Sequence, residues 1–134
     1  MAKYKKKLDA DIRCPLEYGL TIFGGKSGEY PQKLYKALMN SQTVLTVWDD
    51  ARLVGLIRVL DDSEMLAQIH YVLVHPEYQG QGIAGRMVEY IKEKYKNFMY
   101  LELMPEDKKN VHFYEKHGFH VMENGAAMQI CNIN

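Results

Sequence analysis

Cysteine is scarce in this sequence of 134 residues, and the two that occur, Cys14 and Cys131, lie near opposite ends. Neither belongs to a Cys-x-x-Cys or Cys-x-x-His spacing, so the sequence predicts no metal site and no disulfide framework. This usage of cysteine favours a reducing, cytoplasmic setting.

An excess of charge of one sign is also missing, because 17 basic residues balance 17 acidic ones. No long-range field therefore favours nucleic acid or an anionic membrane as a partner. No window approaches the roughly 18 uninterrupted apolar residues of a spanning helix, and no signal-peptide core follows the lysine-rich start. We interpret the lysines between residues 3 and 7 as a solvated tail.

What is present is ordinary globular composition, with 47% apolar and 25% charged residues. A chain of this length is expected to form one domain, residues 1–134. Apolar spacing and turn residues predict alternating helices and strands, hence an α/β fold. We expect strands at residues 8–13, 43–48, 53–60, 65–74 and 98–103, and helices at residues 15–23, 31–39 and 83–96.

Two further elements are expected towards the C-terminus. Asp107 is suited to cap a helix that carries Val111, and Gly118 suits the left-handed residue after its end. Residues 119–122 and 127–133 are expected to form a closing hairpin around the Asn-Gly pair between them.

The glycine-rich loop between the third strand and the following helix allows two structural interpretations. Gly80, Gly82 and Gly85 give a literal G-x-G-x-x-G, with Glu102 about 20 residues later, as in a dinucleotide site. Against this, five residues separate the strand from the first glycine, and too little chain follows the three meandering strands for a doubly wound sheet. A plain turn between strand and helix is the second interpretation.

The loop is also part of a longer pattern. Residues 72–84, VLVHPEYQGQGIA, resemble the acetyl-CoA motif of the GCN5-related N-acetyltransferase (GNAT) superfamily, and residues 113–119, FYEKHGF, resemble its F-Y-x-K-x-G-F segment. The resemblance extends from about Val44 to the C-terminus. It implies a single-domain acyl-CoA N-acyltransferase fold, with a mixed, mostly antiparallel central sheet flanked by helices.

The resemblance implies acetyl-CoA as cosubstrate and no metal. The start of a helix suits a phosphate in general, and by the family pattern the loop backbone would cradle the pyrophosphate while the preceding strand pairs with the pantetheine arm. Asn110 would substitute for a family asparagine whose own position holds Asp107. The implied coenzyme-binding residues are Val72, Leu73, Val74, Gln79, Gly80, Gln81, Gly82, Ile83, Ala84, Gly85 and Asn110.

An amine that attacks a thioester must first lose a proton, because an alkyl ammonium has a pKa of about 10.4. In the family a carboxylate on the strand before the loop often accepts it, whereas alternation here puts Gln68, His70 and Val72 on that face. His70 is the candidate base, since imidazole titrates near pH 6.5. A histidine simply packed on a strand is the structural alternative, and Glu102 is a further candidate for the base.

The departing thiolate needs a proton in turn, and Tyr114 matches the family's general acid. Transfer from a tyrosine of pKa about 10 to a thiolate of pKa about 8.5 is uphill by roughly 2 kcal/mol in water. That cost is small beside a whole reaction barrier, so the role is feasible. The structural alternative is a core aromatic on an amphipathic helix.

The sequence therefore predicts an N-acetyltransferase that moves an acetyl group from acetyl-CoA to a primary amine of a small molecule or peptide. A noncatalytic coenzyme A binding module, sensing or regulatory, is the alternative, and it would keep the loop without needing Tyr114 or a base. Polyamine, aminoglycoside, amino acid, arylalkylamine and protein acceptors all stay open. Small members of the family are often dimers, so a homodimer is an open expectation.

Overall fold

The computed structural model describes residues 3–5 and 29–133. The chain forms two compact units, of which the first ends at Leu103 and the second begins at Met104. The strand and helix expected at residues 8–13 and 15–23 lie outside the described residues, and one domain over the whole chain stays a prediction.

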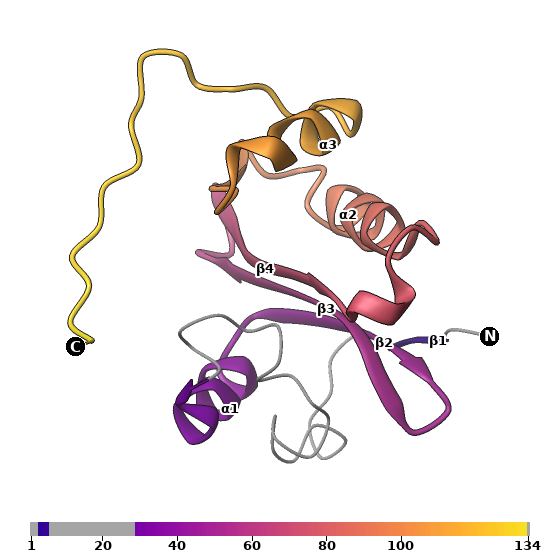
Figure 1. Ribbon diagram of the computed structural model, residues 1–134. Helices are drawn as coiled ribbons and strands as arrows, with labels where there is room; N and C mark the ends of the chain where they lie inside the picture. Colours follow the sequence, from indigo (N-terminus) through magenta and orange to yellow (C-terminus); the bar gives the residue numbers. More distant parts are fainter. Residues whose placement is uncertain (1–2, 6–28, 134) are drawn as a thin grey trace. The chain divides into compact units, whose positions relative to one another are not determined.

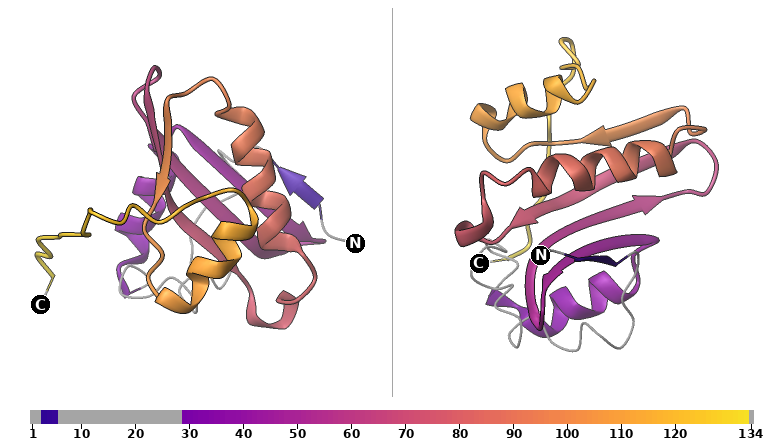
Figure 2. Two further views of the ribbon diagram at one scale, coloured as in Figure 1. Left: turned by 90° about the horizontal axis from the view of Figure 1, so that it is seen from above. Right: turned by 90° about the vertical axis from the view of Figure 1, so that its right-hand side faces the viewer.

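A five-stranded sheet in the order β1-β2-β3-β4-β5 forms the centre of the first unit (Figure 2). Neighbouring strands are antiparallel, except that β4 and β5 are parallel. The mixed, mostly antiparallel sheet that we expected is thereby confirmed. The strands are β1 Lys3–Lys5, β2 Thr43–Asp49, β3 Arg52–Asp61, β4 Leu66–Val74 and β5 Tyr100–Leu103.

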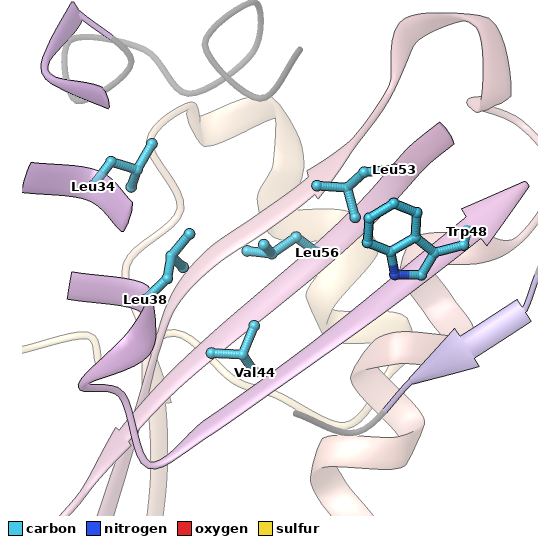
Figure 3. Packing of buried hydrophobic residues seen from close by; sticks show 6 residues of the cluster. All are labelled: Leu34, Leu38, Val44, Trp48, Leu53 and Leu56. Atoms are coloured by element: carbon cyan, nitrogen blue, oxygen red, sulfur yellow. The ribbon is translucent and has the colours of Figure 1, made fainter. Parts of the chain in front are cut away.

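Two helices, α1 (Pro31–Met39) and α2 (Ile83–Lys94), lie on opposite faces of this sheet (Figure 1). Both begin where the sequence predicted. Beneath α1, side chains from the helix and from β2 and β3 form one apolar cluster (Figure 3), and a fully buried leucine contributes about 1.5–3 kcal/mol to such a cluster. Its buried members are Leu34, Leu38, Val44, Trp48, Leu53 and Leu56.

The first residue of α2 approaches the sheet closely because β3 has a glycine beneath it. A Cβ atom on Gly55 would lie 3.1 Å from Ile83 Cγ2 and 3.2 Å from Val47 Cβ. Met87, Val88 and Ile91 continue this apolar face of α2 and are fully buried. The packing against Gly55 therefore fixes where the N-terminus of α2 lies on the sheet.

The pairing of β3 with β4 contains one irregularity. Arg58 lies opposite Tyr71, and the next pair is Val59 with Ile69, which leaves His70 as an extra residue. Such a β-bulge bends the strand and breaks the alternation of its side chains.

The bulge overturns part of the face assignment made from the sequence. Val72 and Ile69 pair with β3 residues two apart, so they share one face. Tyr71 and Leu73 pack against the apolar cluster under α1. The prediction that Val72 shares a face with His70 is therefore wrong, since simple alternation gives no sign of an inserted residue.

The parallel pairing of β4 with β5 covers only one part of β4. It joins Leu66–Ile69 to Tyr100–Leu103. Val72, Leu73 and Val74 continue beyond the last of these pairs and pair with β3 on their other side. In the described part of the chain, the outer backbone edge of this end of β4 has no strand beside it.

The second unit contains a 3₁₀ turn, η4 (Lys108–Asn110), followed by the short helix α3 (Val111–Lys116). The Asp107 side chain accepts a bond from the Lys109 N–H at 3.0 Å, which confirms that it caps this segment. After α3, Gly118 has a φ of 91°, and the N–H groups of residues 118 and 119 bond to the carbonyls of residues 115 and 114. This is a Schellman motif with glycine in the left-handed position.

Two predictions near the chain ends are wrong. Lys3–Lys5 is not a free tail, because it pairs as strand β1 with residues 46–48. No strand forms within residues 119–133. The turn there is closed by a bond from the Gly125 N–H to the Met122 carbonyl, so the Asn-Gly pair does not occupy the two central positions that a hairpin turn of this kind requires.

Candidate active site

The glycine loop leaves β4 through a 3₁₀ turn, η3 (Pro76–Tyr78), and enters α2. Gly80 and Gly82 have φ angles of 81° and 82°, in the left-handed region that side chains disfavour. Apart from their chain neighbours, no atom of the described residues lies within 4 Å of where their Cβ atoms would be. The glycines are therefore needed for backbone conformation, and the described residues leave the space beside these two positions open.

The start of α2 is electrostatically suited to an anion. Gly82 is its N-cap residue, no side chain caps the helix, and the first turn contains no acidic residue. The N–H groups of Ile83, Ala84 and Gly85 precede the first helical bond, which runs from the Arg86 N–H to the Gly82 carbonyl at 3.1 Å. Unused N–H groups and the positive end of the helix dipole favour a phosphate here.

Two loop side chains differ in their surroundings. The Gln79 amide Nε2 donates to the Val74 carbonyl at 3.2 Å, which ties the loop back to the end of β4. Gln81 is exposed, and it stays a predicted binding residue.

A polar cluster that sequence patterns did not predict holds η3 against the β2–β3 hairpin. Arg52 forms an ion pair with Glu77 at 2.7 Å and lies 3.1 Å from His75 Nε2, and the Tyr78 hydroxyl donates to Asp49. That bond raises the pKa of Tyr78. Arg52 and Glu77 are exposed, so their ion pair adds little stability. Together with the partly buried bond between Tyr78 and Asp49, it holds the chain where it approaches the loop.

His70, the predicted base, lies at the bulge and forms a hydrogen bond with Arg58. Arg58 Nη1 lies 2.7 Å from His70 Nδ1. A guanidinium can only donate, so Nδ1 is the acceptor and the proton of a neutral ring is on Nε2. To accept a proton at Nδ1, His70 must first lose the bond from Arg58.

Glu102 lies on the same face of the sheet as Gln68, because the two are partners in the parallel pairing of β5 with β4. Among the described residues its carboxylate has no hydrogen bond or ion pair. Glu102 therefore places a carboxylate on β5, next to the face of β4 on which the sequence offered only Gln68 and His70 as candidates for the base.

Tyr114, the predicted acid, lies on α3 in the second unit. It is half-buried, and its ring contacts Phe113 and Phe119 with centroids 5.0 and 5.9 Å apart. Burial raises the pKa of Tyr114, so the phenol keeps its proton at neutral pH. Asn110 is exposed at the residue before α3.

The described residues contain neither a metal-binding cluster nor a membrane-spanning helix. They contain no group of three or more His, Cys, Asp or Glu residues that could hold a metal ion. None of the helices that the structure describes is long and apolar enough to cross a membrane.

Comparison with known proteins identifies the family. The acetyltransferase (GNAT) family matches residues 16–119, which is most of the chain. The chain therefore belongs to the GNAT acetyltransferase family and has its α/β fold. A comparison with curated protein sequences gives no significant match.

Solved structures agree with this assignment. A GNAT family acetyltransferase from Streptococcus pneumoniae is 26% identical with a TM-score of 0.76, and the match covers 100% of this chain and 98% of that chain. A probable acetyltransferase from Staphylococcus aureus is 28% identical with a TM-score of 0.79, covering 98% of this chain and 99% of that chain. A predicted acetyltransferase with acetyl-CoA from Clostridium acetobutylicum, 16% identical with a TM-score of 0.70 over 96% of both chains, shares the fold.

Proposed function

We propose that this chain transfers an acetyl group from acetyl-CoA to a primary amine of a small molecule or peptide. One observation carries the proposal: an open loop with two left-handed glycines leads directly into an uncapped helix N-terminus, beside a strand end whose outer edge is unpaired in the described chain. A phosphate-bearing ligand with an extended, amide-containing arm fits both features. Membership of the GNAT family supports acetyl-CoA as that ligand.

The coenzyme would be held mainly by backbone. The N–H groups of residues 80–85 would bind the pyrophosphate, whereas the Gln79 N–H already donates to the Pro76 carbonyl at 3.4 Å. The edge of Val72, Leu73 and Val74 would pair with the pantetheine amides. Asn110 would add a side-chain contact. When bound, acetyl-CoA supplies the activated acetyl thioester.

The proton transfers would be divided between two residues of this chain. Tyr114, kept protonated by burial, would donate to the leaving sulfur. His70 would accept the proton of the amine once Arg58 releases Nδ1, and Glu102 would serve in its place if that bond persists. Replacing His70 and Glu102 separately would show which of these two candidate bases limits the rate of acetyl transfer at low pH.

The first experiment compares the melting temperature of the protein alone and with acetyl-CoA, coenzyme A or NADH. A ligand present at 100 times its dissociation constant adds about 2.7 kcal/mol to the free energy of unfolding. Stabilisation by both coenzyme A species but not by NADH supports the proposed ligand. Stabilisation by NADH alone would instead favour a dinucleotide site.

A screen of primary amines with acetyl-CoA then tests turnover, with Tyr114→Phe as the comparison. Acetylated product that falls sharply in this variant supports the enzyme. If coenzyme A binds but no amine is acetylated, the chain is a noncatalytic coenzyme A binding module. Sedimentation of the same preparation tests whether the protein forms the homodimer expected from the resemblance.

A further inference from the structure

Arg58 is a half-buried cation on the α1 face of the sheet, and all its described partners are neutral. Its Nε donates to the Ser41 hydroxyl at 2.7 Å, and its Nη1 lies 2.7 Å from His70 Nδ1. Its guanidinium carbon lies 5.8 Å from the centre of the Tyr71 ring. Ser41 in turn donates to the Ala37 carbonyl at 2.7 Å, so it is an acceptor towards Arg58.

This arrangement is energetically incomplete. Burial lowers the pKa of Arg58, because removing a charge from water is costly unless an opposite charge compensates. Within the described part of the chain, no carboxylate forms an ion pair with Arg58. A guanidinium has five N–H donors, and the two bonds above leave three of them for another acceptor.

A neutral side chain would suffice to link a hydroxyl to an imidazole ring. An arginine at this position instead offers a planar fork that matches a carboxylate in a bidentate way. The anion that completes it must come from outside the described chain, and the face it would occupy also carries His70 and Glu102.

The register places these groups around one stretch of β4. Arg58 on β3 lies opposite Tyr71, beside the bulge at His70, and Glu102 on β5 lies opposite Gln68. A cationic and an anionic side chain therefore lie on either side of β4. Two strand spacings of about 4.8 Å and the offset of three residues along β4 put their backbones roughly 12–14 Å apart. A small molecule with both a carboxylate and an ammonium group complements this pair.

We propose that Arg58 binds a carboxylate of the acceptor, so that the substrate is an amino acid or a similar amine that carries a carboxylate. Glu102 faces the ammonium end of the same molecule. The inference rests on the proposed acetyltransferase function and narrows its acceptor class.

The test uses pairs of amines that differ only by the carboxylate: lysine with cadaverine, and phenylalanine with phenethylamine. For each, kcat/KM is measured with saturating acetyl-CoA, and binding to the protein with coenzyme A is measured by calorimetry. The variants are Arg58→Gln, which removes the charge, and Arg58→Lys, which keeps it. Lys92→Gln is the matched control, because it removes an exposed cation that pairs with Glu89 on α2.

We expect the wild-type protein to prefer the carboxylate-bearing member of at least one pair by about 10- to 100-fold, the range of a hydrogen bond to a charged group. Arg58→Gln should abolish this ratio, Arg58→Lys should restore part of it, and Lys92→Gln should leave it unchanged. The melting-temperature shift with coenzyme A should persist in all variants.

Two results overturn the inference. One is a wild-type protein that binds and acetylates the carboxylate-free amines equally well, or binds no carboxylate-bearing amine at all. The other is an Arg58→Gln variant that lowers kcat/KM equally for both members of a pair, as a purely structural role would. Failure of the proposed function is distinct, because it appears as a missing response to coenzyme A or as binding of amines without acetylation.

Discussion

The Tyr95 hydroxyl links the C-terminal end of α2 to the sheet, and we expect its removal to lower the free energy of unfolding. It donates to Asp61 Oδ2 at 2.6 Å and lies 2.6 Å from Thr43 Oγ1. Because its own proton goes to Asp61, the hydroxyl of Thr43 donates to Tyr95. Tyr95 is 4% exposed and Thr43 is 5% exposed, so Tyr95→Phe leaves the Thr43 hydroxyl buried without this acceptor.

The cost follows from these two bonds. A hydrogen bond to a charged group contributes about 1.5–3 kcal/mol, and a buried polar group left unpaired costs about 1–3 kcal/mol. Asp61 is partly exposed and recovers some hydration, so we expect Tyr95→Phe to lower the free energy of unfolding by about 2–3 kcal/mol at pH 7. Urea unfolding measures it. Tyr90→Phe on the same helix is the matched control, because the described residues give its hydroxyl no hydrogen bond.

The pH dependence gives a second check on the same residue. Burial, and then the bond to Asp61, raise the pKa of Tyr95 to about 12. Between its unfolded value near 10 and this value, only the unfolded state loses the proton, so the stability from Tyr95 is present below pH 10 and declines towards pH 12. A loss under about 0.5 kcal/mol in Tyr95→Phe, or a difference from wild type that grows over this pH range, would refute the reasoning.

Three further substitutions test the backbone of the glycine loop, the packing of α2 against Gly55, and Tyr114 as the general acid. Gly82→Ala should cost about 1–2 kcal/mol because its φ of 82° is strained for alanine, and calorimetry should show weaker acetyl-CoA binding. Gly55→Ala should cost about 1–3 kcal/mol in urea unfolding, since its Cβ would lie 3.1 Å from Ile83. Tyr114→Phe should lower kcat by roughly 10²- to 10⁴-fold with unchanged coenzyme affinity. Because burial raises the pKa of Tyr114, the alkaline decline of wild-type kcat should lie above pH 10.

Each of these has a control or a contrary outcome. Gly125→Ala is matched to the loop variant, because Gly125 does not have the left-handed φ of Gly82 and its added Cβ would have its nearest neighbour at an ordinary 3.6 Å. Equal losses in both variants would remove the conformational argument. An unchanged stability of Gly55→Ala would mean that α2 shifts freely on the sheet. A Tyr114→Phe variant that loses coenzyme binding rather than kcat would make Tyr114 a binding residue.

The sequence predicted the regular elements well where local signals agreed. Helix α1 begins at Pro31, because a proline in the first turn favours a helix start. Strands β2 and β3 flank an acidic turn, because polar residues between two β-branched runs favour a hairpin. Both signals act over a short range in the sequence. The glycine loop and Gly118 were found for the same reason, since left-handed backbone leaves few residue choices.

What the sequence missed depends on partners distant in the chain. Lys3–Lys5 looks like a tail by composition, yet lysines are common on edge strands, where they discourage further pairing. The Asn-Gly pair suggested a hairpin, but the turn closes one residue earlier than that geometry needs. Arg52 and Arg58 were not singled out, because their contacts with Glu77 and Ser41 come from separate elements.

His70 is the extra residue of the bulge in β4, so the pairing of its neighbours does not depend on it. Deleting His70 would leave Ile69 opposite Val59 and Tyr71 opposite Arg58, and Tyr71 and Leu73 would still face the cluster under α1. Pairing His70 into the ladder instead would shift the register by one residue and turn one part of β4 over. Evolution can therefore exchange the side chain at position 70 to suit a new acceptor without turning any neighbour to the other face of the sheet.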